Sequence, residues 1–583
     1  MKKVKNKNKD LKLNNITQLA AGIFIVVLIN VIGSYIFTRF DLTSEKRYSL
    51  SSSTKQLLRE TDDIVYFKVY LQGDFPAGFK RLSQSTKEML DEFRAYSDNI
   101  QYEFINPTVS EDAKTRKDVY DRLVQQGLAP TDISVRTKDG QQQQSIFPGA
   151  LVTYKGRTVP VSLLANQLGA EPETIINNSI QSLEYNISSA IRKLSTTSKP
   201  RIAFTQGHGE LTELETADVA HALSDYYIVD YVDINGQVNS LTERKKAENE
   251  SYNIVNKYKA IIIAKPDSVF SEKDKFIIDQ YIMQGGKVLW LIDPVLATMD
   301  SLQTTNRTIG ITQDINLNDQ LFKYGVRLNS NLLMDLNSLP IPMVTGYMGN
   351  QPQFEFFQWP YFPVLTAVSQ HPIVRNINAI RTEFISSIDT VGNPAIKKTI
   401  LLSSSKYTRI AQTPVMISLE LLGKDPDTHD YIDAGQPVAV LLEGQFESVF
   451  INRIPKEISE APEIGFTGKS PENRMIIIAD GDIIRNQVQF ANGTYTPLPL
   501  GYDRHTGQTF GNKELILNSV NYLCDDTGLM SVRSRELKLR ALDINKARES
   551  LLTWQLLNIL LPIGLIILFG IIQFAVRKHR FSK

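Results

Sequence analysis

Two long apolar runs stand out, one near each end of the chain. They occupy residues 16–37 and about residues 556–576, and neither contains a charged residue. Each is about as long as a helix that crosses a hydrocarbon layer of roughly 30 Å. A cleaved signal peptide is the alternative for the first run, but no clear small-residue cleavage site follows it. A buried soluble helix is the alternative for the second, but no polar face interrupts it. The pattern predicts two transmembrane helices.

The flanking charges orient these helices. Residues 1–15 hold six lysines against one aspartate. Basic flanks stay in the cytoplasm, so this segment is predicted to be a cytoplasmic tail. A second span then returns residues 577–583 to the cytoplasm. The region from Asp41 to about Thr553 is therefore predicted to lie in the periplasm of a cell with an inner membrane, with residues 526–555 as a juxtamembrane segment.

Residues 41–197 show strands and helices in alternation, which predicts a first α/β domain. A short helix capped by Ser52 or Ser53 precedes a Val- and Tyr-rich strand at 63–71, then a helix and a strand at 100–107. This βαβ unit is compatible with a thioredoxin-like fold. The chain has no C-x-x-C motif, which excludes thiol redox chemistry of that kind.

The rest of this domain has the pattern of hairpins followed by a long helix. Asp139-Gly140 and Lys155-Gly156 are turn pairs typical of β-hairpins. The glutamine run at 141–144 is predicted to be an exposed loop. Residues 173–194 predict an amphipathic helix, because apolar residues recur at steps of three and four: Ile176, Ile180, Leu183, Ile187, Ile191 and Leu194.

Residues 198–525 predict a second α/β domain. Continuously apolar strands such as AIIIA and VLWLI alternate with helices, which is typical of a parallel sheet covered on both faces, as in flavodoxin-like folds. RMIIIADGD and NKELILNSVNYL predict two further elements of that sheet. The intervening residues 301–471 are rich in proline, asparagine and aromatic residues. They are predicted to form a β-rich insertion.

Composition narrows the class of protein. The 583 residues are 42% hydrophobic, which is ordinary for a globular chain and excludes a polytopic transporter. Lysine and arginine number 64 against 63 acidic residues, so no basic excess indicates nucleic-acid binding. The single cysteine, Cys524, excludes an intrachain disulfide. The soluble region must therefore be stabilised by its core.

The sharpest local motif is a glycine-rich turn at Gly207, His208, Gly209 and Glu210, between a predicted strand and helix. Ligands bind at such strand ends in open α/β sheets, and helix N-termini favour anions. These four residues are the candidate ligand-binding residues. The alternative is a tight turn in which the glycines only permit the backbone path.

Other motifs are incomplete. GFTGKS at 465–470 resembles a phosphate-binding loop, but Glu463 occupies a required glycine position. DPDTHD at 425–430 lacks the calcium-loop glycine and glutamate, so it predicts an acidic turn. No catalytic elbow and no metal-spaced histidine pair is present in the sequence, so no catalytic residue, metal or cofactor is predicted. Asp293 and Asp480 end predicted strands, but neither alone indicates a reaction.

Several segments together resemble a known family. They are FTRFDLTSEKRYSLS, VYLQGDFPAGFKRL, YEFINP, FTQGHGE, YIMQGGKVLWLIDP, RMIIIADGDIIRN and the closing WQLLNILLPIGLIILFGIIQFAVRKHRF. The chain resembles the GldG family of gliding-motility-associated ABC transporter auxiliary proteins of Bacteroidota. The resemblance implies an inner-membrane subunit that works with an ABC permease and, through it, a cytoplasmic ATPase. It also implies an α/β domain similar to class I glutamine amidotransferases and to a domain of intraflagellar transport proteins. The amidotransferase nucleophile elbow is absent from the sequence, so that activity is not implied.

Two classes of function follow. The first is a non-enzymatic auxiliary subunit of an ABC transporter complex associated with gliding motility or export. The second is an envelope carbohydrate- or peptide-binding protein or hydrolase with its site at His208. Two helices cannot enclose a solute path, so the first class requires a permease. Small and polar residues favour helix contacts, and the candidate partner-binding residues are Asn30, Gly33, Arg39 and Asp41.

Overall fold

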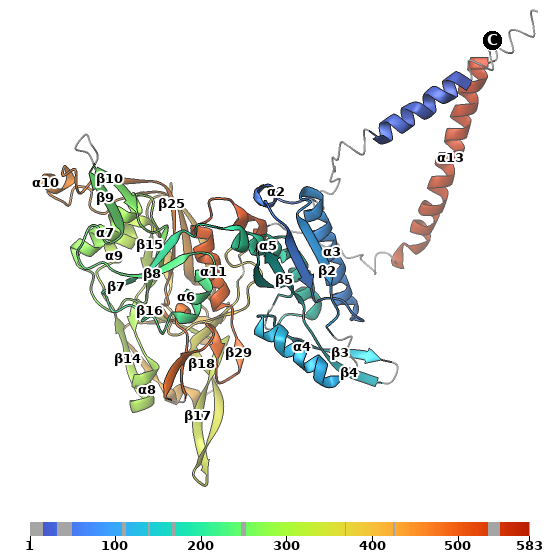
Figure 1. Cartoon of the computed structure of the whole chain (residues 1–583). Helices are drawn as coiled ribbons and strands as arrows, with labels where there is room; N and C mark the ends of the chain where they lie inside the picture. The colour runs from blue at the N-terminus through green and yellow to red at the C-terminus, as the bar shows by residue number, and fades with distance from the viewer. Residues whose placement is uncertain are drawn as a thin grey trace, which may run out of the picture. The chain divides into compact units, whose positions relative to one another are not determined.

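A computed structural model of the chain describes residues 16–31 and 49–581, apart from gaps at 108–111, 138–139, 166, 168, 247–251, 368, 424–425, 492 and 535–547 (Figure 1). The chain forms two compact units, residues 1–535 and residues 536–583. The first unit holds two α/β regions with separate hydrophobic cores. The predicted α/β class is confirmed.

The N-terminal α/β region is built on a four-stranded sheet in the order β2-β1-β5-β6. β1 and β2 are parallel, as the βαβ pattern predicts, whereas β5 is antiparallel to β1. Buried residues of α3 and α5 pack on the sheet. The elements are α2 (Ser52–Glu60), β1 (Val65–Val69), α3 (Ala77–Tyr96), β2 (Ile100–Phe104), α4 (Ala113–Gln125), β3 (Thr131–Thr137), β4 (Gly140–Ile146), β5 (Gly149–Tyr154), β6 (Arg157–Ser162) and α5 (Pro172–Ser195).

Two local predictions in this region are wrong. The cap of α2 is Ser51, whose Oγ accepts a hydrogen bond from the Thr54 backbone N–H at 3.1 Å. The glutamine run at 141–144 is part of strand β4, which pairs with β3. Glutamine side chains do not prevent a strand whose backbone is satisfied by a neighbour, because strand preference depends strongly on context.

Helix α5 is confirmed, and its apolar stripe forms the middle of the N-terminal core. All six residues of the predicted stripe are buried. The same helix also holds α2 in place, because Glu184 accepts hydrogen bonds from the Ser51 backbone N–H at 2.7 Å and the Thr54 hydroxyl at 2.9 Å. A single long helix therefore organises both the sheet and the start of the region.

The central sheet of the second α/β region has seven strands in the order β21-β24-β25-β12-β11-β7-β8. Five of them, from β25 to β8, are parallel, as their apolar sequences predict. Helices α6 and α11 pack on one face, and α7 and α9 on the other. The elements are β7 (Arg201–Gln206), α6 (Ala217–Ser224), β8 (Ile228–Asp233), β11 (Ala260–Ala264), α7 (Glu272–Met283), β12 (Lys287–Leu291), α9 (Asn318–Tyr324), β21 (Lys397–Ser403), β24 (Pro437–Glu447), β25 (Lys469–Ile478) and α11 (Asn512–Leu523).

The β-rich stretch at 301–471 also contributes to the central sheet. Its strand β24 pairs antiparallel with β25, and β21 pairs antiparallel with β24. Antiparallel edge strands of this kind are common on parallel sheets. The same stretch forms a long hairpin of β17 (Ser338–Met348) and β18 (Gln351–Leu365), which extends beyond its neighbours (Figure 1).

Shorter elements complete the first unit. They are β9 (Thr242–Lys246), β10 (Tyr252–Asn256), β13 (Val295–Leu296), α8 (Met299–Thr305), β14 (Arg307–Thr312), β15 (Val326–Leu328), β16 (Asn331–Asp335), β19 (Ile380–Arg381), β20 (Ile388–Thr390), β22 (Thr408–Gln412), β23 (Val415–Ser418), η1 (Leu419–Gly423), η2 (Thr428–Asp430), α10 (Lys456–Ser459), η3 (Asp482–Ile484), β26 (Val488–Ala491), β27 (Thr494–Pro497), β28 (Tyr502–Asp503), β29 (Gln508–Thr509) and η4 (Leu529–Ser534).

The second unit contains a long apolar helix, α13 (Leu551–Phe581). Its segment Leu551–His579 is long and apolar enough to cross a membrane, and an 18-residue stretch within it has a mean hydropathy of 2.7. The helix Ile16–Val31 at the other end of the chain is apolar but shorter. The predicted first span continues to residue 37, outside the described residues. The C-terminal helix is thus a candidate membrane anchor, while the two-span topology stays a prediction.

Candidate functional site

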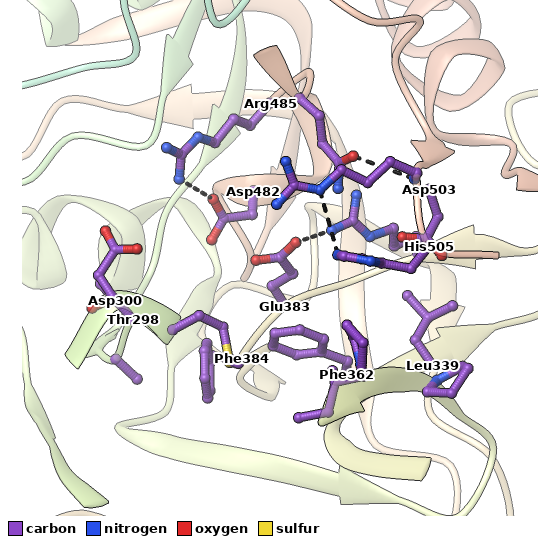
Figure 2. A pocket seen from close by; sticks show the side chains of 18 of the residues that line it. Thr298, Asp300, Leu339, Phe362, Glu383, Phe384, Asp482, Arg485, Asp503 and His505 are labelled. Atoms are coloured by element: carbon purple, nitrogen blue, oxygen red, sulfur yellow. Dashed lines mark hydrogen bonds and ion pairs between the residues drawn. The ribbon is translucent and has the colours of Figure 1, made fainter. Parts of the chain in front are cut away.

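A cavity of about 600 Å³ lies at the carboxyl ends of the central strands (Figure 2). Lys265 and Asp482 line it and follow β11 and β25, and Asp293, which contacts Lys265, follows β12. Carboxyl ends of parallel strands meet at one edge of a sheet, which is where ligands bind in open α/β folds. The volume is within the range of small-molecule sites.

A lysine links the three strand ends. The Lys265 ammonium lies 3.1 Å from Asp293 and also pairs with Asp482. Burial lowers the pKa of Lys265, but the two carboxylates outweigh burial and raise it above its ordinary value. Gly481 makes this approach possible, because a Cβ there would lie 2.5 Å from the Lys265 Cβ. The cluster therefore carries a fixed positive charge between two carboxylates.

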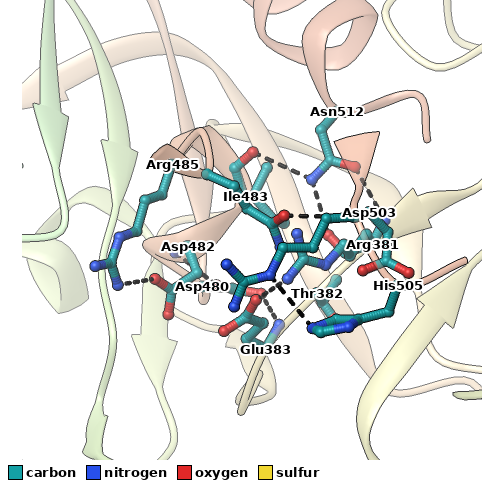
Figure 3. Close-up of polar contacts among 12 residues, drawn as sticks. Arg381, Thr382, Glu383, Asp480, Asp482, Ile483, Arg485, Asp503, His505 and Asn512 are labelled. Carbon is teal, nitrogen blue, oxygen red and sulfur yellow. Dashed lines mark hydrogen bonds and ion pairs between the residues drawn. The ribbon is translucent and has the colours of Figure 1, made fainter. Parts of the chain in front are cut away.

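Asp480 connects β25 to the segment that follows β19 (Figure 3). It is fully buried, and it accepts hydrogen bonds from the backbone N–H of Asp482 at 2.7 Å and of Glu383 at 3.0 Å. Burial, and then the neighbouring Asp293 and Asp482 carboxylates, raise the pKa of Asp480 well above its usual range. Asp480 thus helps to position the charged residues of the cavity.

Arginines complete the charged wall. Arg381 pairs with Glu383. It also donates to the side-chain oxygen of Gln487 at 3.2 and 3.3 Å, in the amide orientation that satisfies both ends of that group. Arg485 pairs with Glu215 at 3.0 Å and with Asp482 at 3.5 Å. These residues come from distant parts of the sequence, and only the fold brings them together.

The opposite wall is apolar. It is supplied mainly by the β17–β18 hairpin and by the turn before α8: Ala297, Met299, Leu339, Ile341, Met343, Val344, Phe354, Phe362, Phe384 and Leu419. Figure 2 shows Phe362, Phe384 and Leu339 below the charged residues. The cavity is therefore two-sided, with one charged and one hydrophobic wall, which suits a ligand that has both a polar and an apolar part.

The glycine-rich turn after β7 does not line this cavity, and it is packed against other parts of the protein. His208 is 5% exposed, and its ring stacks on Phe270 with centroids 3.8 Å apart. Its Nε2 is 3.2 Å from an Asp274 carboxylate oxygen, and Glu210 accepts a hydrogen bond from the His208 backbone N–H at 2.6 Å. The side chains of this turn are therefore engaged inside the protein.

The glycines of the turn have steric and backbone roles. Gly207 and Gly209 have positive φ values, +111° and +73°. A Cβ at Gly209 would lie 1.6 Å from Asp267 Oδ1, and Asp267 donates its backbone N–H to the His208 carbonyl at 3.0 Å. That Gly207, His208, Gly209 and Glu210 bind a ligand stays a prediction, which would require this packed turn to open.

Comparison with known proteins identifies the second α/β region. A family model described as "ABC-type uncharacterized transport system" matches residues 199–519, more than half of the chain. The chain belongs to this family. It therefore has an accessory role in an ABC-type transport system and associates with transporter components. A second model, described as a domain of unknown function, matches residues 44–153.

Two further similarities are weaker. An "Uncharacterized protein" of Borreliella burgdorferi (strain ATCC 35210 / DSM 4680 / CIP 102532 / B31) is 20% identical over 582 residues, which are 98% of this chain and 99% of that protein. A solved structure titled "mmIFT52 N-terminal domain" aligns with 56% of this chain and 97% of its own, at 13% identity and a TM-score of 0.30. That score is too low to indicate a shared fold.

The predicted partner-binding residues lie mostly outside the described part of the chain. Gly33, Arg39 and Asp41 are not among the described residues. Asn30 is described, and its side-chain amide donates to the Val26 carbonyl of its own helix at 2.9 Å. Its role in partner binding stays a prediction.

Other motifs now have structural assignments. GFTGKS leads into strand β25, whereas a phosphate-binding loop follows a strand. Cys524 is buried, and burial raises the pKa of its thiol to about 11, so it is protonated at neutral pH. Among the described residues, no group of three or more His, Cys, Asp or Glu side chains is arranged to hold a metal ion.

The sequence indicates only part of this cavity. Asp293, Asp480 and Lys265 each follow a strand of one predicted parallel sheet, so all three are recognisable as residues of the same sheet edge. That shared position was the available signal. Arg381 and Glu383 belong to a stretch with no recognisable pattern, and nothing in the sequence placed them near β25.

Proposed function

We propose that the protein is a non-enzymatic auxiliary subunit of an ABC transporter complex in the inner membrane, with its α/β regions in the periplasm. The observation that carries the proposal is the family match over residues 199–519, the region that holds the cavity. The apolar helix α13 supports a membrane location.

A binding role suits the cavity better than a catalytic one. Its central charges neutralise one another, since Lys265 and Arg485 share Asp482 and Arg381 pairs with Glu383. The only thiol of the chain, at Cys524, is buried and protonated. A general acid or base must be able to exchange a proton with a substrate, and Lys265, whose pKa the two carboxylates raise, holds its proton at neutral pH.

The proposed partners are a polytopic permease and, through it, a cytoplasmic ATPase. One or two apolar helices cannot enclose a path for a solute, so transport requires further membrane helices. We propose, in line with the GldG-type resemblance, that the complex serves gliding motility or export. Loss of surface movement, or of a secreted product, in a deletion strain distinguishes these two roles.

Affinity purification of the full chain from native membranes tests this proposal. A multispan permease and an ATPase are expected to co-purify in reproducible ratio. Asn30→Leu combined with Gly33→Leu is expected to weaken this association by removing a polar group and a small residue from one face of the predicted first span. The volume-conserving pair Ile25→Leu and Leu28→Ile is the matched control.

The outcomes distinguish the proposed contact face of the first helix from the auxiliary role itself. Retention of the whole complex by the Asn30 and Gly33 double variant excludes that helix face as the contact. If the wild-type chain co-purifies with no multispan protein, the auxiliary-subunit proposal itself is wrong.

A further inference from the structure

We propose that the cavity binds an anionic amphiphile, a molecule with a carboxylate or phosphate head and an apolar chain. This inference concerns the isolated protein and does not depend on its assembly with a permease. It follows from three features of the cavity: the one cation left over after internal pairing, the apolar wall, and the sequence of the strand that forms that wall.

Three of the lining cations are already neutralised, since Arg381 pairs with Glu383 and the other two lie between carboxylates. Lys265 lies between Asp293 and Asp482, and Arg485 lies between Asp482 and Glu215. The charges of Lys265 and Arg485 are therefore balanced by carboxylates of the protein itself. They fix the shape of the charged wall but leave little capacity for a further anion.

Arg504 is different. It lines the cavity and is exposed, and no carboxylate among the described residues lies within ion-pair distance of it. Its Nε donates to His505 Nε2 at 3.4 Å. Partial desolvation, together with the Arg504 and Arg381 cations, outweighs Asp503 and lowers the pKa of His505, so this imidazole is neutral at pH 7. The other N–H groups of the Arg504 guanidinium therefore remain available to a ligand.

Arg381 also lines the cavity. Its terminal nitrogens contact Glu383 and the Gln487 side-chain oxygen, and its Nε is buried. Guanidinium groups match carboxylate and phosphate geometry with paired N–H donors. Arg504 is therefore the group of the cavity that fits an anionic head, whereas the charge of Arg381 is balanced by Glu383.

The remaining lining carboxylates are not ion-paired with Arg504. Asp503 is buried and accepts hydrogen bonds from the Thr506 N–H at 3.0 Å and hydroxyl at 2.6 Å, which ties it into its own turn. Asp300 is exposed and lies away from His505 in Figure 2. Arg504 is thus the lining cation whose N–H donors remain available to an anion.

The apolar wall fits a hydrocarbon chain better than an extended peptide. β17 is the edge strand of its sheet, since it pairs with β18 on one side. Pro340 and Pro342 are two apart, so their nitrogens face the same edge, and proline is tolerated where that edge is unpaired. A peptide that added a strand here would find no N–H donor at either position. An acyl chain needs none.

Equilibrium binding to the full chain in phosphatidylcholine nanodiscs tests the proposal, with empty nanodiscs as background. The probes are decanoate and decyl phosphate, which separate the two kinds of head group, together with uncharged decanol and an apolar tetrapeptide. At least one anionic probe is expected to bind saturably and more tightly than decanol. Arg504→Gln is expected to weaken it by about tenfold, the effect of losing one charge-assisted contact.

Matched variants keep the test falsifiable. Phe354→Ser removes an apolar lining residue and is expected to weaken binding, whereas Tyr347→Ser, on the same hairpin but outside the lining, is not. Arg59→Gln, at an exposed position of α2, controls for the lost charge. The proposal is overturned if neither anion binds saturably, if decanol or the tetrapeptide binds as tightly, or if Arg504→Gln binds like wild type. Co-purification with a permease is a separate result, so the two proposals fail independently.

Discussion

Single residues decide how the two turns at the sheet edge behave. Gly481 lets Lys265 reach Asp293 and Asp482, which opens a charged wall onto the cavity. Gly209 lets the turn after β7 pack directly against Asp267, which closes it. Both turns contain glycine and follow strands, so their sequences alone do not distinguish an open site from a packed one.

The closed turn has a testable electrostatic signature. Burial lowers the pKa of His208, but Glu210 and Asp274 outweigh it and raise the pKa above 6.5. A raised folded-state pKa gives stability that is present below the unfolded pKa and lost as pH rises through the folded pKa. We therefore expect the thermal midpoint to fall above pH 6.5 more steeply in wild type than in His208→Gln.

The control for this experiment is His221→Gln, since His221 is exposed on α6. Differential scanning fluorimetry of the full chain across neutral pH measures the slopes. If His208→Gln and wild type have parallel pH profiles, His208 gains no protonated-state stability from its two carboxylates.

At the scale of elements, long periodic segments were predictable and polar or interrupted ones were not. The stripe of α5 and the apolar strands β7, β11, β12 and β25 appear where the sequence indicates. Helix α4 was missed because its own side chains carry little hydrophobic pattern. The hairpin that contains β4 was predicted, and only the glutamine run within it was taken for a loop. Strands β21 and β24 were predicted to belong to an insertion. No pattern in their local sequence shows that they pair with the strands of the central sheet.

The α5 helix offers a direct test at this scale. Leu183 is fully buried in the N-terminal core, so Leu183→Ala is expected to lower the free energy of unfolding by about 2–5 kcal/mol. Thr174→Ala, at an exposed position of the same helix, is expected to change it by about 0.5 kcal/mol or less. Pulse proteolysis in urea gives both values. Equal effects would mean that α5 does not organise this core.

At the scale of the whole molecule, topology is the property that most needs measurement. Cys524 is the sole cysteine, and it is buried, with a thiol pKa of about 11. It is therefore not expected to react with a maleimide label at neutral pH. A membrane-impermeant maleimide applied from outside is expected to modify Lys87→Cys, at an exposed position of α3, and to miss Lys5→Cys. The reverse pattern would show that the α/β regions are cytoplasmic.

The sequence by itself determined the α/β class, the parallel core of the second region, the long helix α5 and an apolar C-terminal helix. These follow from periodicity and continuous apolar runs, which are local properties of the chain. Only the tertiary structure decided that β21 and β24 complete the central sheet and that Lys265, Arg381 and Asp482 meet at its edge. Lys265 and Asp482 are 217 residues apart in the sequence. No local pattern links residues so far apart, because their pairing depends on how whole strands and helices pack.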